Sequence, residues 1–108
     1  MPQHRDKVSL RHMLDHAREA TDMIQGKTRA DLDADRQLNL ALVRLLEIIG
    51  EAATRISEEE RALHHTIPWP EIVSLRNRLI HGYDSVDFDI LWNIISKDLP
   101  SLIETLER

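Results

Sequence analysis

The feature that most constrains the fold of this chain is a long stretch with helical periodicity between residues 34 and 56. Apolar side chains recur there every three or four positions and form one continuous stripe, made of Leu38, Leu42, Leu45, Ile49, Ala52 and Ile56. Because an α-helix turns once in about 3.6 residues, this spacing puts the stripe on a single face. The sequence therefore predicts a helix over residues 34–56 that packs this face into a core.

The reverse side of this helix carries an internal glycine, Gly50, between Val43 and Thr54. Glycine inside a helix costs about 1 kcal/mol relative to alanine, and close approach of another backbone is one physical reason to keep it. The pattern fits two interpretations, a second packing face around Gly50 or a tolerated surface glycine. Glu47 and Glu51 lie near the same side and are candidate partners for an arginine or for a second subunit.

Shorter periodic segments predict further helices on both sides of the long one. Ser57 suits the start of a short helical turn, Asp87 suits the start of a later helix, and Gly26 suits the end of the first helix. Pro100 is expected to kink or restart the last helix because proline lacks a backbone N–H. The other expected elements are helices over residues 5–25, 70–81 and 101–107 and a polar loop over residues 27–33.

These elements predict an all-α protein, an antiparallel bundle of four to five helices in one domain that spans residues 1–108. The chain has no cysteine, so neither disulfides nor thiolate metal sites hold it together, which fits a cytoplasmic location. The N-terminus has no apolar signal core, and no apolar run reaches the length of a membrane span. His12 and His16 have a spacing that can bind a metal, but no third ligand is evident and a solvated face explains them. We expect no metal and no cofactor.

One polar segment, residues 69–84, interrupts this pattern of packed helices. Pro70 fits the first turn of a helix and Gly82 fits the position just past its end. On a helical wheel over residues 70–81, Arg76 projects from the middle of the apolar arc, whereas Asn77 and His81 lie together at its edge. A buried guanidinium needs a partner, so either a carboxylate meets Arg76 or this face forms a polar cleft against a partner.

The same segment carries a family resemblance. The series Arg76-Asn77-x-x-x-His81-x-Tyr83 resembles the Arg-x-x-x-x-His-x-Tyr motif of HepT-type toxins, which belong to the HEPN superfamily of metal-independent ribonucleases. Further pieces of the chain resemble family motifs in the family's order, namely Ile49-Gly50-Glu51-Ala52, Ile67-Pro68-Trp69, Val86-Asp87 and Leu91-Trp92. The resemblance covers nearly the whole chain.

The resemblance implies a symmetric homodimer in which motif residues of both subunits line one cleft. Arg76 and His81 would be the catalytic residues, and Asn77, Arg78 and Tyr83 would position the RNA substrate. An arginine offers a planar fork to phosphate oxygens, and a histidine can act as base or acid near neutral pH. One histidine supplies only one of the two proton carriers that RNA cleavage needs, which gives a physical reason for a dimeric site.

The family also implies a regulator. HepT toxins are paired with a minimal nucleotidyltransferase antitoxin that adds AMP to the motif tyrosine, here Tyr83. Without the resemblance, His81 has another explanation as a helix C-terminal histidine interacting with the helix dipole, and Tyr83 as a packed side chain. A second functional class stays open as well, a non-catalytic module that binds nucleotide or RNA and accompanies a nucleotidyltransferase.

Charge is distributed in a way that bears on these alternatives. The net charge of −5 argues against a broad electrostatic grip on nucleic acid. Residues 61–83 carry three arginines against one glutamate, whereas residues 46–60 carry one arginine against five glutamates. The polar segment is therefore a mildly basic island, which suits a small phosphate site better than a long nucleic-acid groove.

Overall fold

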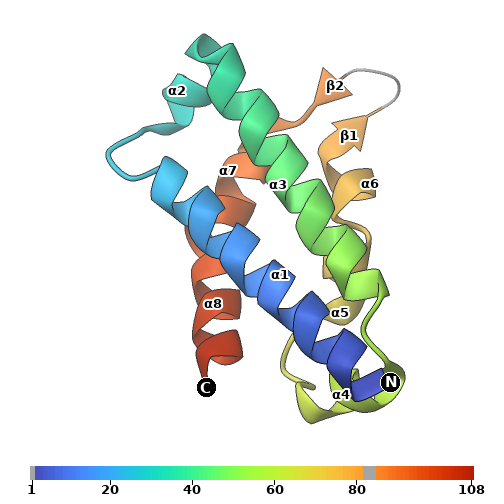
Figure 1. Ribbon diagram of the computed structural model, residues 1–108. Helices are drawn as coiled ribbons and strands as arrows, with labels where there is room; N and C mark the ends of the chain where they lie inside the picture. The colour runs from blue at the N-terminus through green and yellow to red at the C-terminus, as the bar shows by residue number, and fades with distance from the viewer. Residues whose placement is uncertain (1, 82–84) are drawn as a thin grey trace.

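The computed structural model describes residues 2–81 and 85–108, with the backbone alone for residues 2, 3 and 81. Two long antiparallel helices, α1 (Pro2–Met23) and α3 (Arg36–Thr54), form one side of the molecule (Figure 1). The other elements are α2 (Arg29–Ala34), α4 (Glu58–Leu63), α5 (Trp69–Val73), α6 (Leu75–Leu79), β1 (Ile80–His81), β2 (Ser85–Val86), α7 (Phe88–Asn93), the π-helix η1 (Ile94–Asp98) and α8 (Leu99–Glu107).

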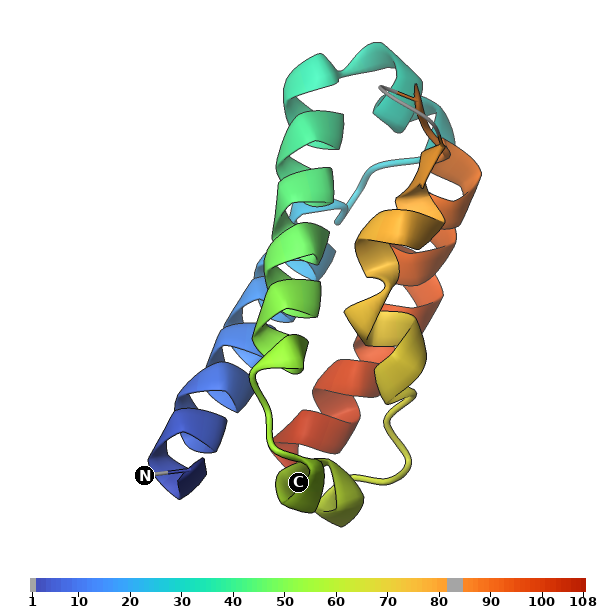
Figure 2. The same ribbon diagram turned by 90° about the vertical axis from the view of Figure 1, so that its right-hand side faces the viewer.

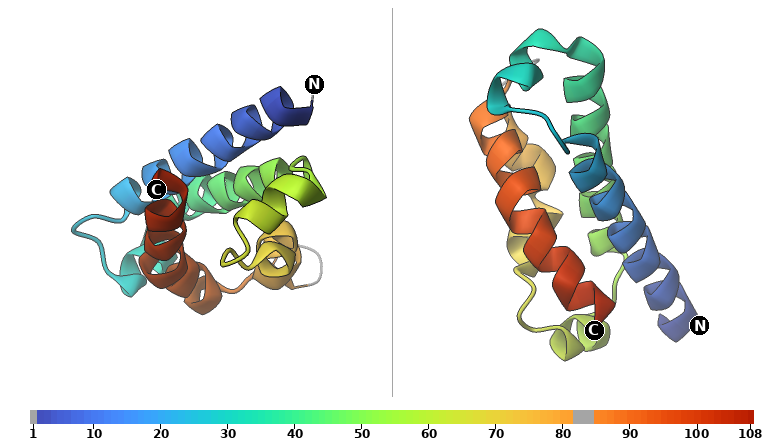
Figure 3. Two further views of the ribbon diagram at one scale, coloured as in Figure 1. Left: turned by 90° about the horizontal axis from the view of Figure 1, so that it is seen from below. Right: turned by 90° about the vertical axis from the view of Figure 1, so that its left-hand side faces the viewer.

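The elements after α4 form the second side of the molecule. The pair α5–α6 runs antiparallel to α3, and α7, η1 and α8 follow one another as one bent column beside it (Figures 2 and 3). The space between the two sides is filled by aliphatic side chains; the fully buried large ones are Met13, Leu32, Leu42, Leu46, Ile49, Leu79, Leu91, Ile94 and Ile95. The predicted all-α bundle is therefore confirmed, and the stripe of α3 lies at its centre.

Residues 27–33 differ from the predicted polar loop because they contain the start of α2. Thr28 and Asp31 form a capping box, and the backbone N–H of Thr28 donates to the Asp31 carboxylate at 2.6 Å. Leu32 is fully buried on this short helix. Arg29 fastens α2 to the first turn of α7 through an ion pair with Asp89 at 2.7 Å. The segment was predicted as a loop because its composition is polar. Its helix is stabilised by one buried leucine and by the capping contacts.

The corner between α3 and α5 sets the position of the polar segment. Ser57 caps α4, and its hydroxyl and backbone N–H both donate to the carboxylate of Asp6, which is only 3% exposed. Farther along, the Trp69 indole N–H donates to the carbonyls of Arg61 and His64. The Arg61 guanidinium lies over the same indole ring at 5.6 Å and donates to the Ala53 carbonyl at 2.8 Å. These contacts fix the point where α5 begins.

The expected single helix over residues 70–81 is two short helices followed by a strand. Ser74 separates α5 from α6, and its hydroxyl donates to the carbonyl of Pro70 at 2.8 Å, which offers the backbone an alternative to a regular helix. Helix α6 ends at Leu79, where Ile80 turns to an extended conformation. The residues Ile80–His81 then pair with Ser85–Val86 in an antiparallel β-ribbon. Gly82, the predicted helix terminator, lies outside the described residues.

Pro100 acts on the C-terminal column as predicted, and the structure shows how. The backbone N–H of Leu99 bonds to the carbonyl of Ile94, five residues back, so η1 is a π-helical turn directly before the proline. Asp87 begins the column, and its carboxylate accepts from the backbone N–H groups of Asp89 and Ile90. Among the described residues, no helix is long and apolar enough to cross a membrane.

Candidate functional site

The polar segment faces α3 across a small depression of about 190 Å³. Helix α3 contributes Glu47, Gly50, Glu51 and Thr54, α5 contributes Val73, and α6 contributes Arg76 and Asn77. The structure thus joins two groups that lie more than 20 residues apart in the chain, the reverse side of the long helix and the first half of the predicted catalytic motif. This depression is the candidate site.

Arg76 reaches α3 through its Nε atom, which lies 3.3 Å from the Glu47 carboxylate. The Arg76 side chain is 68% exposed, whereas that of Glu47 is 27% exposed. Of the two interpretations of Arg76, the one with a carboxylate partner is confirmed. No other described residue forms an ion pair or hydrogen bond with this guanidinium, and Arg76 lines the open depression. Four N–H donors therefore stay available for an anion.

The prediction that Arg76 projects from the middle of a buried arc is wrong. The buried positions are Ile72, Leu75 and Leu79, and Val73 and Ile80 are only partly buried. The helical wheel treated Val73 and Ile80 as core positions, and this placed the centre of the apolar arc at Arg76. The break at residue 74 and the early end of α6 remove the regular turn on which that count depended. Arg76 consequently lies at the border of the packed face.

Gly50 explains how the motif helix comes so close to α3. A Cβ atom at this position would lie 3.0 Å from the carbonyl oxygen of Ile72 and 3.7 Å from that of Val73. Of the two interpretations of Gly50, the close approach of another backbone is confirmed, and the other backbone is α5 of the same chain. This contact brings Arg76 within reach of Glu47, three residues before Gly50 on α3. The second packing face predicted here is therefore occupied within the protomer.

The remaining motif residues are placed to different extents. Asn77 is exposed and lines the depression beside Arg76. The backbone of His81 belongs to β1, which follows α6 directly, and the backbone N–H of Asp87 donates to the carbonyl of Leu79 at 2.9 Å and closes the ribbon onto the helix. Tyr83, the predicted AMP acceptor, lies outside the described residues. The structure therefore places the Arg76 side chain of the predicted catalytic pair. For His81, five residues later in the chain, it describes the backbone alone.

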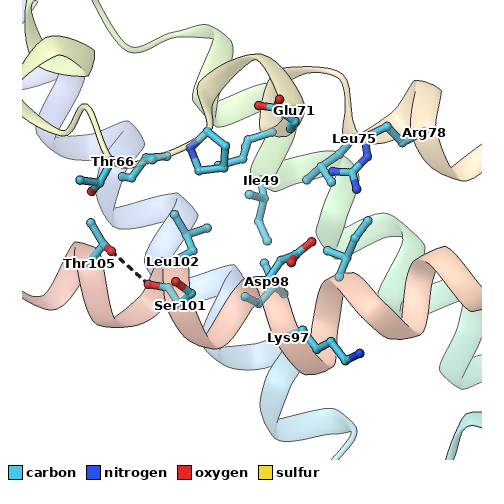
Figure 4. Close-up of a pocket in the computed structure, with 15 residues that line it drawn as sticks. Ile49, Thr66, Glu71, Leu75, Arg78, Lys97, Asp98, Ser101, Leu102 and Thr105 are labelled. Carbon is cyan, nitrogen blue, oxygen red and sulfur yellow. Dashed lines mark hydrogen bonds between the residues drawn. The ribbon is translucent and has the colours of Figure 1, made fainter.

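Arg78 lies apart from this depression. It lines a larger cavity of about 400 Å³, which has α5 and α6 on one wall and η1 and α8 on the other. The Arg78 guanidinium points into this cavity, toward the wall that carries Asp98 (Figure 4). The floor of that cavity is apolar and is formed by Ile49, Leu75, Leu102 and neighbouring core residues. Within a single protomer, Arg76 and Arg78 therefore line different hollows. The positioning role predicted for Arg78 stays a prediction.

Histidines outside the motif show no metal-binding arrangement. The Nδ1 atom of His16 is 2.7 Å from the carbonyl oxygen of His12, one turn back on α1. His64 contacts the carboxylate of Glu60 at 2.9 Å within α4 and its cap. Among the residues that the structure describes, no group of three or more histidine, aspartate or glutamate side chains is arranged to hold a metal ion.

Comparison with known proteins decides the family. The model of the family described as "Ribonuclease HepT-like" matches residues 13–108, which include α3 and the whole polar segment. The chain belongs to the HepT-like ribonuclease family. The match extends over both walls of the depression, so the resemblance seen in the motif holds for the fold around it.

Individual HepT-like relatives match over nearly their full length. A protein of Thermococcus cleftensis named "Probable ribonuclease HepT" is 38% identical over 106 residues, which cover 94% of this chain and 96% of the relative. A "Putative RNase" of Caldanaerobacter subterraneus subsp. tengcongensis is 39% identical over 93 residues, which cover 86% of this chain and 83% of the relative. Another "Putative RNase", of Methanocaldococcus jannaschii, is 33% identical over 94% of this chain and 93% of the relative. No solved structure matches the chain.

Proposed function

We propose that this protein is an endoribonuclease toxin that cleaves RNA at Arg76 and His81 without a metal ion. The observation that carries the proposal is the pairing of Arg76 with Glu47 beside Asn77 in an open depression, on the segment that bears the family motif. Membership of the HepT-like family and the names of the relatives support the reaction class. We expect the protein to act in the cytoplasm.

The proposed reaction is an internal transfer at one phosphodiester. A base removes the proton from the ribose 2′-hydroxyl, the 2′-oxygen attacks phosphorus, and the bond to the 5′-oxygen breaks as an acid protonates that oxygen. The Nη donors of Arg76 would hold two phosphate oxygens and stabilise the charge that grows on them. His81 would act as base or acid, and Asn77 would orient the phosphate or the imidazole. The products are a 2′,3′-cyclic phosphate and a 5′-hydroxyl.

Two proton carriers are needed and each chain offers one motif histidine, so we propose that the active form is a homodimer with His81 of both subunits near the two-fold axis. The high exposure of Arg76 supports this arrangement, because its outer edge is free to border a shared cleft. Light scattering at micromolar concentration tests the assembly. A stable monomer that still cleaves RNA would contradict it.

Regulation would come from a nucleotidyltransferase antitoxin that transfers AMP from ATP to Tyr83, with pyrophosphate as the leaving group. The added phosphodiester is anionic and would pair with the guanidinium that otherwise holds RNA. Because Tyr83 is the only tyrosine of the chain, Tyr83→Phe is a clean test. The wild type incubated with partner and Mg-ATP should gain the mass of AMP, whereas the variant should not. A variant that still gains this mass would assign the modification to another residue.

The cleavage activity itself is tested with purified protein and RNA in the presence of a chelator. We expect Arg76→Ala and His81→Ala each to lower the cleavage rate by about 10²-fold or more, because each removes a group that acts in the transition state. Arg108→Gln is the matched control, since Arg108 is exposed at the C-terminus and pairs only with Glu104 among the described residues. Wild-type protein that binds RNA but leaves it intact would favour the accessory-module alternative instead.

A further inference from the structure

A second groove borders α3 next to the candidate site, on the flank of the helix that faces α1. It lies between α1 and α3, has a volume of about 230 Å³, and is lined by Ser9 and His12 of α1 and by Arg44, Ile48, Glu51, Ala52 and Arg55 of α3. Glu51 lines both this groove and the depression at Arg76. Because α3 lies between α1 and α6 on one face of the molecule, the two hollows are neighbours across a single helix (Figure 1).

The groove is cationic although the whole chain is acidic. Arg44 is exposed and forms no ion pair or hydrogen bond with any described residue. Within the described part of the chain, Arg55 pairs only with Glu51, at 3.5 Å and with both side chains exposed. An exposed pair of this kind contributes less than about 1 kcal/mol. His12 adds an imidazole that can donate to an anion. Two arginines and one histidine thus face a single carboxylate, in a protein of net charge −5.

We propose that this groove binds the phosphate backbone of the RNA that enters the Arg76 site. The inference rests on the proposed function and adds a path for the substrate across α3. Charge and continuity favour RNA as the occupant: the cations are free or weakly held, and the groove shares a wall residue with the site where the scissile phosphate would bind. Arg44 and Arg55 are about 16 Å apart along the helix axis, so they reach different phosphates.

Glu51 does not block such a path. Its carboxylate is held by Arg55 in the free protein, in the same way that Glu47 is held by Arg76. A phosphate that approaches Arg55 replaces one exposed carboxylate as the partner of the guanidinium. The lost pair is weak, whereas a phosphate offers an arginine two oxygens at once. At Arg76, the Nη groups can bind a phosphate while Glu47 keeps its contact with Nε. The two glutamates therefore keep the arginines extended over the surface until RNA arrives.

The test uses a single-stranded oligonucleotide with 2′-O-methyl riboses, which cannot be cleaved because the attacking hydroxyl is absent. Its affinity is measured by fluorescence anisotropy between 50 and 200 mM salt, a range of about fourfold in concentration over which phosphate contacts change affinity strongly. Each phosphate contact on a single strand contributes about 0.7 to the slope of log affinity against log salt. We expect Arg44→Gln and Arg55→Gln each to lower the slope by about this amount and to weaken binding severalfold.

Lys97→Gln is the matched control, because Lys97 is exposed on η1 at the far cavity and its removal changes the net charge equally. It should leave the slope at the wild-type value. If Arg44→Gln and Arg55→Gln behave like Lys97→Gln, the groove is not an RNA contact, and an acidic protein partner becomes its better occupant. Wild type that does not bind the oligonucleotide also overturns the inference. Cleavage is scored separately on natural RNA, so an active enzyme with unchanged slopes contradicts this inference alone.

Discussion

At the scale of single residues, the contact between Arg76 and Glu47 gives the candidate site its geometry. The carboxylate meets Nε, and the Nη groups of Arg76, which lines the depression, have no ion pair or hydrogen bond with any described residue. An arginine held at one edge loses part of its conformational freedom before the substrate binds, which lowers the entropic cost of positioning it. We therefore propose that Glu47 is a positioning residue, whose effect on RNA cleavage acts through Arg76.

Glu47→Gln tests this role. The amide keeps the shape of the side chain but removes the charge that holds Nε, so we expect kcat to fall about tenfold while the midpoint of thermal unfolding changes little. Glu104→Gln is the control for the loss of one paired carboxylate, because Glu104 pairs with Arg108 near the end of α8, away from the candidate site. If the two variants have the same kcat, Glu47 does not position the catalytic arginine.

Asp6 is the residue whose ionisation matters for stability. Its pKa is lowered, first by the hydrogen bond from the Ser57 backbone N–H and next by the Ser57 hydroxyl, with a smaller effect of the Arg5 charge. A carboxyl group with a lowered folded-state pKa stabilises the fold fully above the pKa that it has in the unfolded chain. This stabilisation disappears as the pH falls through the lowered value.

We therefore expect the free energy of unfolding of the wild type to fall at acidic pH more steeply than that of Asp6→Asn. The variant has no carboxylate at this position that could be protonated. Urea unfolding at a series of pH values from neutral to strongly acidic measures the difference. Asp22→Asn on the same helix serves as the control, because Asp22 is exposed and its side chain has no partner in the described residues. Parallel pH profiles for wild type and Asp6→Asn would contradict the role of this contact.

At the scale of elements, the sequence was most informative where one physical rule dominates. The stripe from Leu38 to Ile56 predicted the central helix, because about five turns of apolar residues at helical spacing fit no other secondary structure. A packing face around Gly50 was one of two interpretations, and Glu47 was one candidate partner for an arginine; both residues contact the motif segment. The segment itself was mispredicted after Ser74, because a serine bonded to its own helix and a β-ribbon with Ser85–Val86 compete with helix propensity. Such non-local pairing leaves no mark in the local pattern.

Gly50→Ala is the sharpest test of the packing between α3 and α5. Alanine favours the helix by about 1 kcal/mol, but its Cβ meets the Ile72 carbonyl at 3.0 Å, and overpacking of this kind costs about 1–3 kcal/mol. We expect a net loss of about 1 kcal/mol in urea unfolding, together with reduced RNA cleavage because α5 and α6 move away from Glu47. A variant stabilised by its helix propensity would show that the two backbones are not in tight contact.

At the scale of the whole molecule, the candidate site and the cationic groove lie on one face of the bundle. The Arg76 depression and the groove with Arg44 and Arg55 flank the same exposed side of α3, while the apolar cavity at Arg78 opens toward η1 and α8. The sequence predicted the family and the motif, but it could not predict this grouping. The groove is formed by residues near α1 and α3 that lie more than 30 positions apart, and none of them belongs to the Arg-x-x-x-x-His-x-Tyr motif.

The central claim is that this fold cleaves RNA by attack of the neighbouring 2′-hydroxyl at the Arg76 site. Mass spectrometry of the fragments made by the purified protein in the presence of a chelator tests it most directly. The account predicts fragments that end in a 2′,3′-cyclic phosphate with 5′-hydroxyl partners, and no cleavage where the scissile ribose is replaced by 2′-deoxyribose. Fragments with 3′-hydroxyl ends, cleavage at the 2′-deoxy position, or fragments formed equally by Arg76→Ala would contradict it.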